Sequence, residues 1–109
     1  MKTYNIESIK QYIEENDLKR RDRHQEFNYK RIYITYLLRN YFGLPFERIG
    51  EIVGRNHSNC IHALRNHEHL KYDTNYNYYI NEIEQVLNPT KQFSHLELEV
   101  LEIENIEQL

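Results

Sequence analysis

The sequence predicts an all-α fold, a small helical bundle, on three observations. The 109 residues include only three glycines and two prolines, so few positions break a helix. Apolar residues recur at helical spacing in successive segments, and no run alternates long enough to indicate a sheet. The chain is also long enough for one compact domain, and its hydrophobic fraction of 39% can fill a core.

The first helix is predicted by Ile6, Ile9 and Ile13, which lie at helical spacing within residues 5–20. The polar and basic stretch over residues 17–27 follows, and its pattern fits either a helix extension or a loop.

The second helix is expected to be central, because residues 28–42 are apolar on nearly every side. Asn28 is its expected N-cap and Gly43 its end. Pro45 lies where a short third helix begins, a position that its missing N–H permits, and that helix runs to Val53.

Two more helices are expected after the break at Gly54. Asn56 or Ser58 can cap the first of them, which runs to about Lys71. Asp73 or Thr74 starts the next, and Asn88-Pro89 ends it. Its apolar stripe comprises Tyr76, Tyr79, Ile80, Ile83 and Leu87.

An acidic amphipathic helix is predicted at the C-terminal end. Ser94-His95-Leu96-Glu97 is a capping-box pattern, and the helix would run to Leu109. Its apolar stripe either folds back on the bundle or pairs with a second copy or another protein. We therefore divide the chain into an N-terminal helix and basic segment (1–27), a helix-turn-helix domain (28–88) and the acidic helix (89–109). The apolar stripe of the predicted acidic helix comprises Leu96, Val100, Ile103 and Ile106.

Charge is unevenly distributed along the chain. The formal net charge is -3, yet residues 19–71 sum to +6 and residues 91–109 to -4. A cationic middle segment indicates a nucleic-acid partner, although patches of this size also occur on solvated helices.

The short helix, the glycine turn and the longer helix that follows have the outline of a helix-turn-helix. At 100° per residue, His62, Arg65 and His69 fall within roughly 40° of Ser58 on the longer helix, flanked by Asn59 and Asn66. This face carries no carboxylate, and its residue types are those that contact base edges and phosphates. The opposite arc comprises Cys60, Ile61, Ala63, Leu64 and His67.

The run from Ile49 to Ala63, IGEIVGRNHSNCIHA, resembles the signature of the C-terminal DNA-binding domain of the bacterial replication initiator DnaA. The family pattern has Ile-Gly, then Gly-Arg-Asp-His-Thr/Ser, then His-Ala. The resemblance covers about residues 28–87. It implies an all-helical domain with a Trp-repressor-like helix-turn-helix. The initiator's nucleotide-binding domain has no counterpart in these residues, so we expect no ATP-driven assembly.

The resemblance also implies which residues contact DNA. Arg55 matches an arginine that contacts DNA, while Asn56, His57 and Ser58 occupy positions that read bases in the major groove. Asn56 replaces the usual Asp and adds a donor, which suits adenine where a carboxylate prefers cytosine. Asn59 replaces a Thr, and His62 keeps the second His.

Further DNA contacts are expected around this motif. His62 and Arg65 would contact the DNA backbone, and backbone N–H groups near Phe46 would meet a phosphate. Arg48 is a further candidate on the same short helix. The arginine that enters the minor groove in the family would come from a basic loop, and the candidates are Lys19, Arg20, Arg21, Arg23 and Arg31.

Other functions fit the residues less well. No Walker-type loop exists, which excludes an ATPase, and the single cysteine excludes an intrachain disulfide and a four-cysteine zinc site. The histidines at 57, 62, 67 and 69 lack the common metal-ligand spacings, so we expect no metal and no cofactor. A nucleophilic pair of Cys60 and His62 is disfavoured, because residues two apart on a helix point in different directions. Tyr72, Tyr76, Tyr78 and Tyr79 fit core and interfacial positions better than a stacking surface for single strands.

We therefore expect a non-enzymatic, cytoplasmic, nucleoid-associated protein that binds double-stranded DNA sequence-specifically and regulates replication initiation or transcription. It would be a stand-alone regulator or a phage or mobile-element protein. The alternative is a protein-interaction adaptor whose helix-turn-helix no longer reads DNA. No signal peptide and no membrane-spanning segment are expected.

Overall fold

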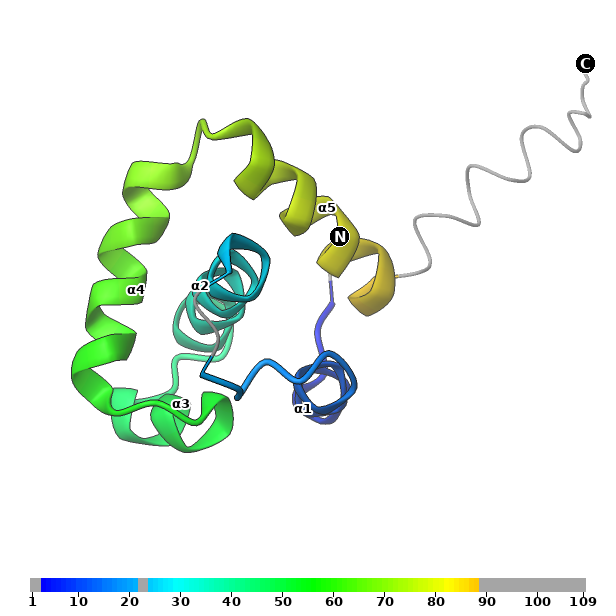
Figure 1. Ribbon diagram of the computed structural model, residues 1–109. Coiled ribbons are helices and arrows are strands. Elements are labelled where there is room, and N and C mark those ends of the chain that lie inside the picture. Colours follow the sequence, from blue (N-terminus) through cyan, green and yellow to red (C-terminus); the bar gives the residue numbers. More distant parts are fainter. Residues whose placement is uncertain (1–2, 22–23, 89–109) are drawn as a thin grey trace, which may run out of the picture.

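The computed structural model describes residues 3–21 and 24–88, and within these ranges it contains five helices and no strand (Figure 1). The predicted all-α fold is confirmed. None of the described helices is long and apolar enough to cross a membrane. The helices are α1 (Ile6–Glu15), α2 (Gln25–Asn40), α3 (Phe46–Val53), α4 (His57–Leu70) and α5 (Thr74–Leu87).

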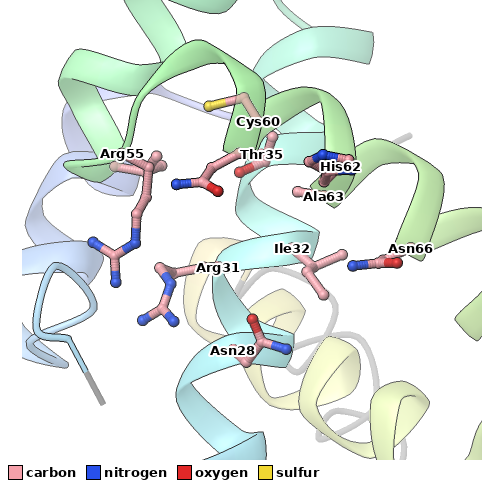
Figure 2. A pocket seen from close by; sticks show the side chains of 11 residues that line it. Asn28, Arg31, Ile32, Thr35, Arg55, Cys60, His62, Ala63 and Asn66 are labelled. Carbon is pink, nitrogen blue, oxygen red and sulfur yellow. The ribbon is translucent and has the colours of Figure 1, made fainter. Parts of the chain in front are cut away.

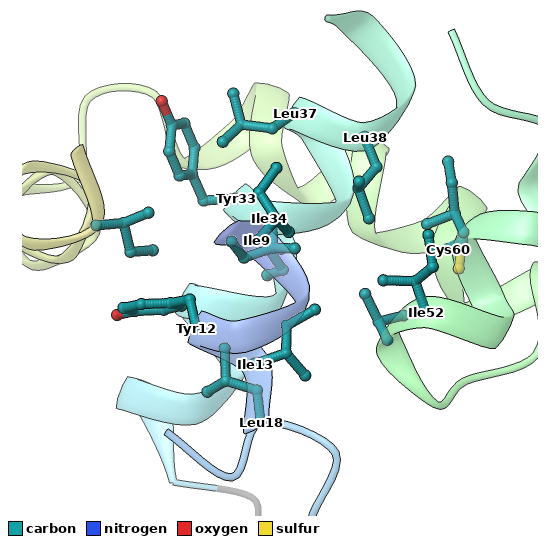
Figure 3. Packing of buried hydrophobic residues seen from close by; sticks show 14 of the residues in the cluster. Ile9, Tyr12, Ile13, Leu18, Tyr33, Ile34, Leu37, Leu38, Ile52 and Cys60 are labelled. Carbon is teal, nitrogen blue, oxygen red and sulfur yellow. The ribbon is translucent and has the colours of Figure 1, made fainter. Parts of the chain in front are cut away.

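Helix α2 is the centre of the molecule. Figure 1 views it nearly along its axis, with the other four helices arranged around it. It packs against α3, α4 and α5, as a helix that is apolar on most sides must. Side chains of all five described helices meet in one hydrophobic cluster, part of which is shown in Figure 3. The fully buried members include Ile9, Ile13, Ile34, Leu38, Ile49, Cys60 and Ile83.

Two predicted helix boundaries near the basic segment were wrong. The first helix ends at Glu15 rather than near residue 20, because Asp17 adopts a left-handed backbone conformation (φ 53°). The chain turns there, and the buried Leu18 donates its amide to the carbonyl of Ile13 (3.0 Å). The second helix begins at Gln25 rather than after Asn28, and the Asn28 amide is already bonded within its first turn.

Helix α2 ends at Asn40 rather than at residue 42, and the bounds of α3, α4 and α5 agree with the sequence. Asn56 caps α4 by accepting a hydrogen bond from the backbone N–H of Asn59 (2.9 Å), and Asp73 caps α5 through Tyr76 (3.0 Å). On α5, Tyr76 is fully buried together with Ile83, and Ile80 and Leu87 are partly buried against the core. The predicted acidic helix lies outside the described residues.

A buried carboxylate ties the beginning of the described chain to the end of α5. Glu84 is 4% exposed and accepts hydrogen bonds from the hydroxyls of Tyr4 (2.7 Å) and Tyr33 and from the Asn88 amide (3.1 Å). The Thr3 amide in turn donates to the Asn88 side-chain oxygen (3.1 Å). Burial and the neighbouring Glu84 raise the pKa of Tyr4 to about 12. Both hydroxyls therefore remain donors, and the carboxylate is satisfied where water does not reach it.

His67 is a core residue of α4. Its ring stacks on Tyr36 (centroids 3.9 Å apart), and its Nδ1 lies 2.7 Å from the Tyr76 hydroxyl. Burial lowers the pKa of His67, so the neutral imidazole is the form that the core holds. The side chain thus attaches α4 to α2 and α5 and leaves the opposite face of α4 outward.

Candidate nucleic-acid interface

The helix-turn-helix consists of α3, a turn at residues 54–56 and α4. Gly54 ends α3 in a left-handed conformation (φ 74°). The carbonyl of Gly50 accepts hydrogen bonds from the amides of Gly54 (2.8 Å) and Arg55 (2.9 Å). A Cβ atom on Gly50 would overlap the backbone carbonyl of Arg55. The two glycines therefore set how closely the turn packs on α3, and hence the angle at which α4 leaves it.

The outer face of α4 is exposed along its length. At its N-terminal end the structure places His57, Ser58 and Asn59 on the surface. His62 and Arg65 follow on the same face, while Cys60 on the opposite side is buried. In Figure 1, α4 runs along one edge of the molecule. The helix dipole adds a partial positive charge at the end that carries His57.

Asn56, one of the two caps predicted for this helix, has a structural role beside its place in the motif. Its side-chain oxygen is used to cap α4, which leaves its amide nitrogen as the group available to a base. An Asp at this position would make the same cap, so the Asn found here preserves the start of the helix. The substitution therefore changes the donor set of the surface without changing the fold.

The basic loop, which we define as residues 18–21, lies against the turn of the helix-turn-helix. The Arg55 guanidinium donates to the backbone carbonyls of Lys19 (3.0 Å), Arg20 (2.8 Å) and Gly54 (2.9 Å). Arg31 of α2 donates to the carbonyl of Leu18 (3.0 Å). Burial and the nearby charge of Arg21 lower the pKa of Arg55.

The side chains of the basic loop take different positions. The aliphatic stem of Lys19 lies over Gly54, in contact distance of an added Cβ. Arg20 lies over the Phe27 ring (4.7 Å to its centroid) and 3.8 Å from the Asp17 carboxylate. Arg21 is exposed. The candidate Arg23 lies outside the described residues.

A polar pocket of about 190 Å³ lies between α2, the turn and α4 (Figure 2). Arg31 and Arg55 lie next to each other on one side of it, and Cys60, His62 and Asn66 of α4 lie on the other. The sequence did not indicate Asn28 and Thr35 as site residues, because α2 and α4 meet only in the folded chain. The pocket is lined by Asn28, Arg31, Ile32, Thr35, Val53, Arg55, Asn59, Cys60, His62, Ala63 and Asn66.

Helix α3 presents both predicted and unpredicted groups. Pro45 precedes it and makes no side-chain cap, so nothing from that residue's side chain covers the first N–H groups near Phe46. Arg48 is exposed and lies 3.5 Å from Glu51. Glu47 and Glu51 line a second surface pocket together with Arg21, His57 and other residues of the turn. The helical wheel of α4 could not reveal these carboxylates, because they come from the neighbouring helix.

The model of the bacterial DnaA protein helix-turn-helix family matches residues 8–66, from α1 to the middle of α4. The chain belongs to this family. The predicted resemblance to the DnaA C-terminal domain is thereby confirmed, and the match starts earlier and ends earlier than the stretch that carried the resemblance. Neither the comparison with curated proteins nor that with solved structures gave a match.

Membership of the DnaA helix-turn-helix family makes DNA the expected partner of this surface. Among the described residues, no three His, Cys, Asp or Glu side chains gather closely enough to hold a metal ion. The groups exposed on the N-terminal half of α4 and on the basic loop include hydrogen-bond donors and cations, the types of group that contact DNA.

Proposed function

We propose that this chain binds double-stranded DNA sequence-specifically, with the N-terminal half of α4 in the major groove. The observation that carries the proposal is the exposed, carboxylate-free face that begins at His57 and lies beside a basic loop fixed to the same turn. A helix of this kind fits the major groove, and cations on either side would contact the phosphate backbone.

Each exposed residue has a proposed role. His57, Ser58 and the Asn56 amide face base edges, together with the Asn59 side chain. These are short hydrogen-bonding groups at the end of the helix that enters the groove first. His62 and Arg65, one and two turns further on, contact the backbone.

Phosphate contacts would also come from outside α4. Lys19, Arg20 and Arg21 contribute from the basic loop, and the backbone N–H groups near Phe46 contribute from the start of α3. Arg48 adds a cation on α3. One of the loop arginines would enter the minor groove.

By occupying initiator-type sites, a protein of this design would regulate replication initiation or transcription. Nothing in this role requires an enzymatic step, because occupancy alone excludes a competing protein from the same duplex. We place it in the cytoplasm at the nucleoid, where such sites are.

Selection of duplexes from a random pool, followed by fluorescence anisotropy on the selected sequence, tests the proposal. If about six phosphates are neutralised, log affinity falls against log salt with a slope near -5. The paired variant His57→Ala/Ser58→Ala is expected to lose discrimination between the selected and a scrambled duplex. A slope near zero with every duplex would refute the proposal.

A matched pair of charge variants sharpens this test. Arg65→Ala and Lys71→Ala each remove one exposed positive charge from α4 or its C-cap. Lys71 lies roughly 20 Å along the axis from the N-terminal end of the helix. Arg65→Ala should weaken binding and lower the magnitude of the salt slope by about 1, whereas Lys71→Ala should change both little.

The protein-interaction adaptor is the second candidate, and the exposed apolar side chains on α5 favour it. Tyr78 and Val86 are 59% and 57% exposed. An adaptor would keep its activity in the His57→Ala/Ser58→Ala variant and lose it when Tyr78 and Val86 are replaced. The two functions are thus separated by two sets of variants.

A further inference from the structure

Arg55 directs most of its hydrogen-bond donors to backbone carbonyls of its own chain. A guanidinium has five N–H donors, and three of those on Arg55 point at backbone carbonyls, two in the basic loop and one in the turn. The two loop residues that Arg55 bonds, Lys19 and Arg20, lie 36 and 35 positions away in the sequence. The side chain is therefore a bridge between the basic loop and the helix-turn-helix.

The bridge places like charges close together. Arg55 lies near Arg21, whose charge contributes to lowering its pKa, and it bonds to the backbone of Lys19 and Arg20. Repulsion among these cations favours a loop that moves away from the turn. The carbonyl oxygens, with their partial negative charge, hold the guanidinium in place against that repulsion. The loop is thus kept near α4 by hydrogen bonds of this side chain.

Two further contacts act in the same direction. Arg31 reaches from α2 to the carbonyl of Leu18, and Figure 2 shows its side chain next to that of Arg55. The stem of Lys19 packs over Gly54. The basic loop is consequently fixed at three successive residues, by contacts from α2 and from the turn.

We propose that Arg55 is a positioning residue that locks the basic loop against the turn, so that the loop cations and α4 meet DNA in one fixed register. The inference rests on the proposed DNA binding for its consequence, but the lock itself is a property of the free protein. A loop that is ordered beforehand does not lose conformational freedom on binding, which favours affinity and fixes the spacing between the two contact regions. The charge of Arg55 matters less in this role than the planar fork of its donors.

Arg55→Lys is the decisive substitution, because it keeps the charge and removes the fork. An ammonium on a shorter, flexible stem does not bridge three carbonyls in the guanidinium's geometry. In the free protein, we expect amide hydrogen exchange at Leu18 and Arg20 to accelerate, while exchange in the buried part of α2 and the melting temperature stay close to wild type. Unchanged exchange in the loop would overturn the proposal. Arg31→Lys provides a second variant with the same expected readout, should Arg55→Lys fail to fold.

Binding to the selected duplex then tests the consequence through a double-mutant cycle of Arg55→Lys and Arg21→Gln. With the loop locked, Arg21→Gln should lower affinity and reduce the salt slope by about 1. In the Arg55→Lys background the same change should cost at least about threefold less, since coupled residues are not additive. Fully multiplicative losses would indicate that Arg55 contacts DNA independently, and would overturn the proposal. If the wild-type protein binds no duplex at low salt, the DNA-binding function fails, and the hydrogen-exchange comparison still decides whether the lock exists.

Discussion

Replacing Gly50 with alanine should disrupt the helix-turn-helix at its closest backbone approach. The added Cβ would overlap the carbonyl oxygen of Arg55, which is backbone and has no rotamer that moves it away. To relieve this overlap, the turn has to move away from α3. The shift would stretch the two hydrogen bonds that the Gly50 carbonyl accepts from Gly54 and Arg55.

The expected loss of unfolding free energy combines two destabilising contributions and one stabilising contribution. Overpacking in a close-packed region costs about 1–3 kcal/mol. The two weakened hydrogen bonds add about 1 kcal/mol each. Alanine within a helix gains about 1 kcal/mol over glycine, which offsets part of the loss. The net loss of unfolding free energy is about 2–4 kcal/mol, or at least about 10 °C in melting temperature for a domain of this size.

Thermal and urea denaturation followed by circular dichroism would measure this loss, with two comparison variants. Gly54→Ala is strained by its positive φ, at about 1–2 kcal/mol. The atoms that its Cβ would approach belong to the flexible Lys19 side chain, which can move away. Glu51→Ala, at an exposed site on α3, should change stability little. Gly50→Ala should therefore be the most destabilised of the three. If it is as stable as wild type, or more stable than Gly54→Ala, the account of the turn is wrong.

Three further predictions concern the other contacts. Burial lowers the pKa of His67, so the unfolded chain takes up the proton first and stability falls as the pH drops below the ordinary value of 6.5. This fall, measured by urea denaturation at pH 7.5 and 5.5, should be smaller in His67→Gln, and an equal fall in both proteins would contradict it. Tyr33→Phe should lower the free energy of unfolding by about 2 kcal/mol, because it removes a donor from the buried Glu84 carboxylate. A loss smaller than that caused by a Tyr→Phe change at an exposed position would refute the network. Asn56→Asp should keep the α4 cap, and therefore the stability in thermal melts, while it shifts the selected DNA sequence. Asn56→Ala should lower the free energy of unfolding by about 1 kcal/mol, because it removes the cap. Equal stability of the two variants would contradict the capping role.

The sequence predicted the helices best where a residue marks a helix end by its own chemistry. Gly54, Asn56 and Asp73 end or begin helices in the structure as their conformational freedom and side-chain oxygens indicate. Residues 17–27 carry no such marker. There the left-handed Asp17 and the burial of Leu18 decide the path of the chain, and both depend on packing against α1 that a local pattern does not contain.

From the sequence, the candidate site could be predicted within single helices but not where different helices meet. The exposed row on α4 follows from its periodicity, since the opposite arc contains the buried Cys60 and His67. The use of Arg55 as a bridge does not follow, because its partners are distant in the sequence. The carboxylates Glu47 and Glu51 beside His57 were missed for the same reason, because they belong to another helix.

The Glu84 network has a practical consequence for handling the protein. It brings Thr3 and Asn88 together, and Figure 1 places the end of α5 across α2 from the helix-turn-helix. A fluorophore attached at the exposed Thr3 would lie on the side remote from the helix-turn-helix. The anisotropy experiments can therefore use protein labelled at Thr3.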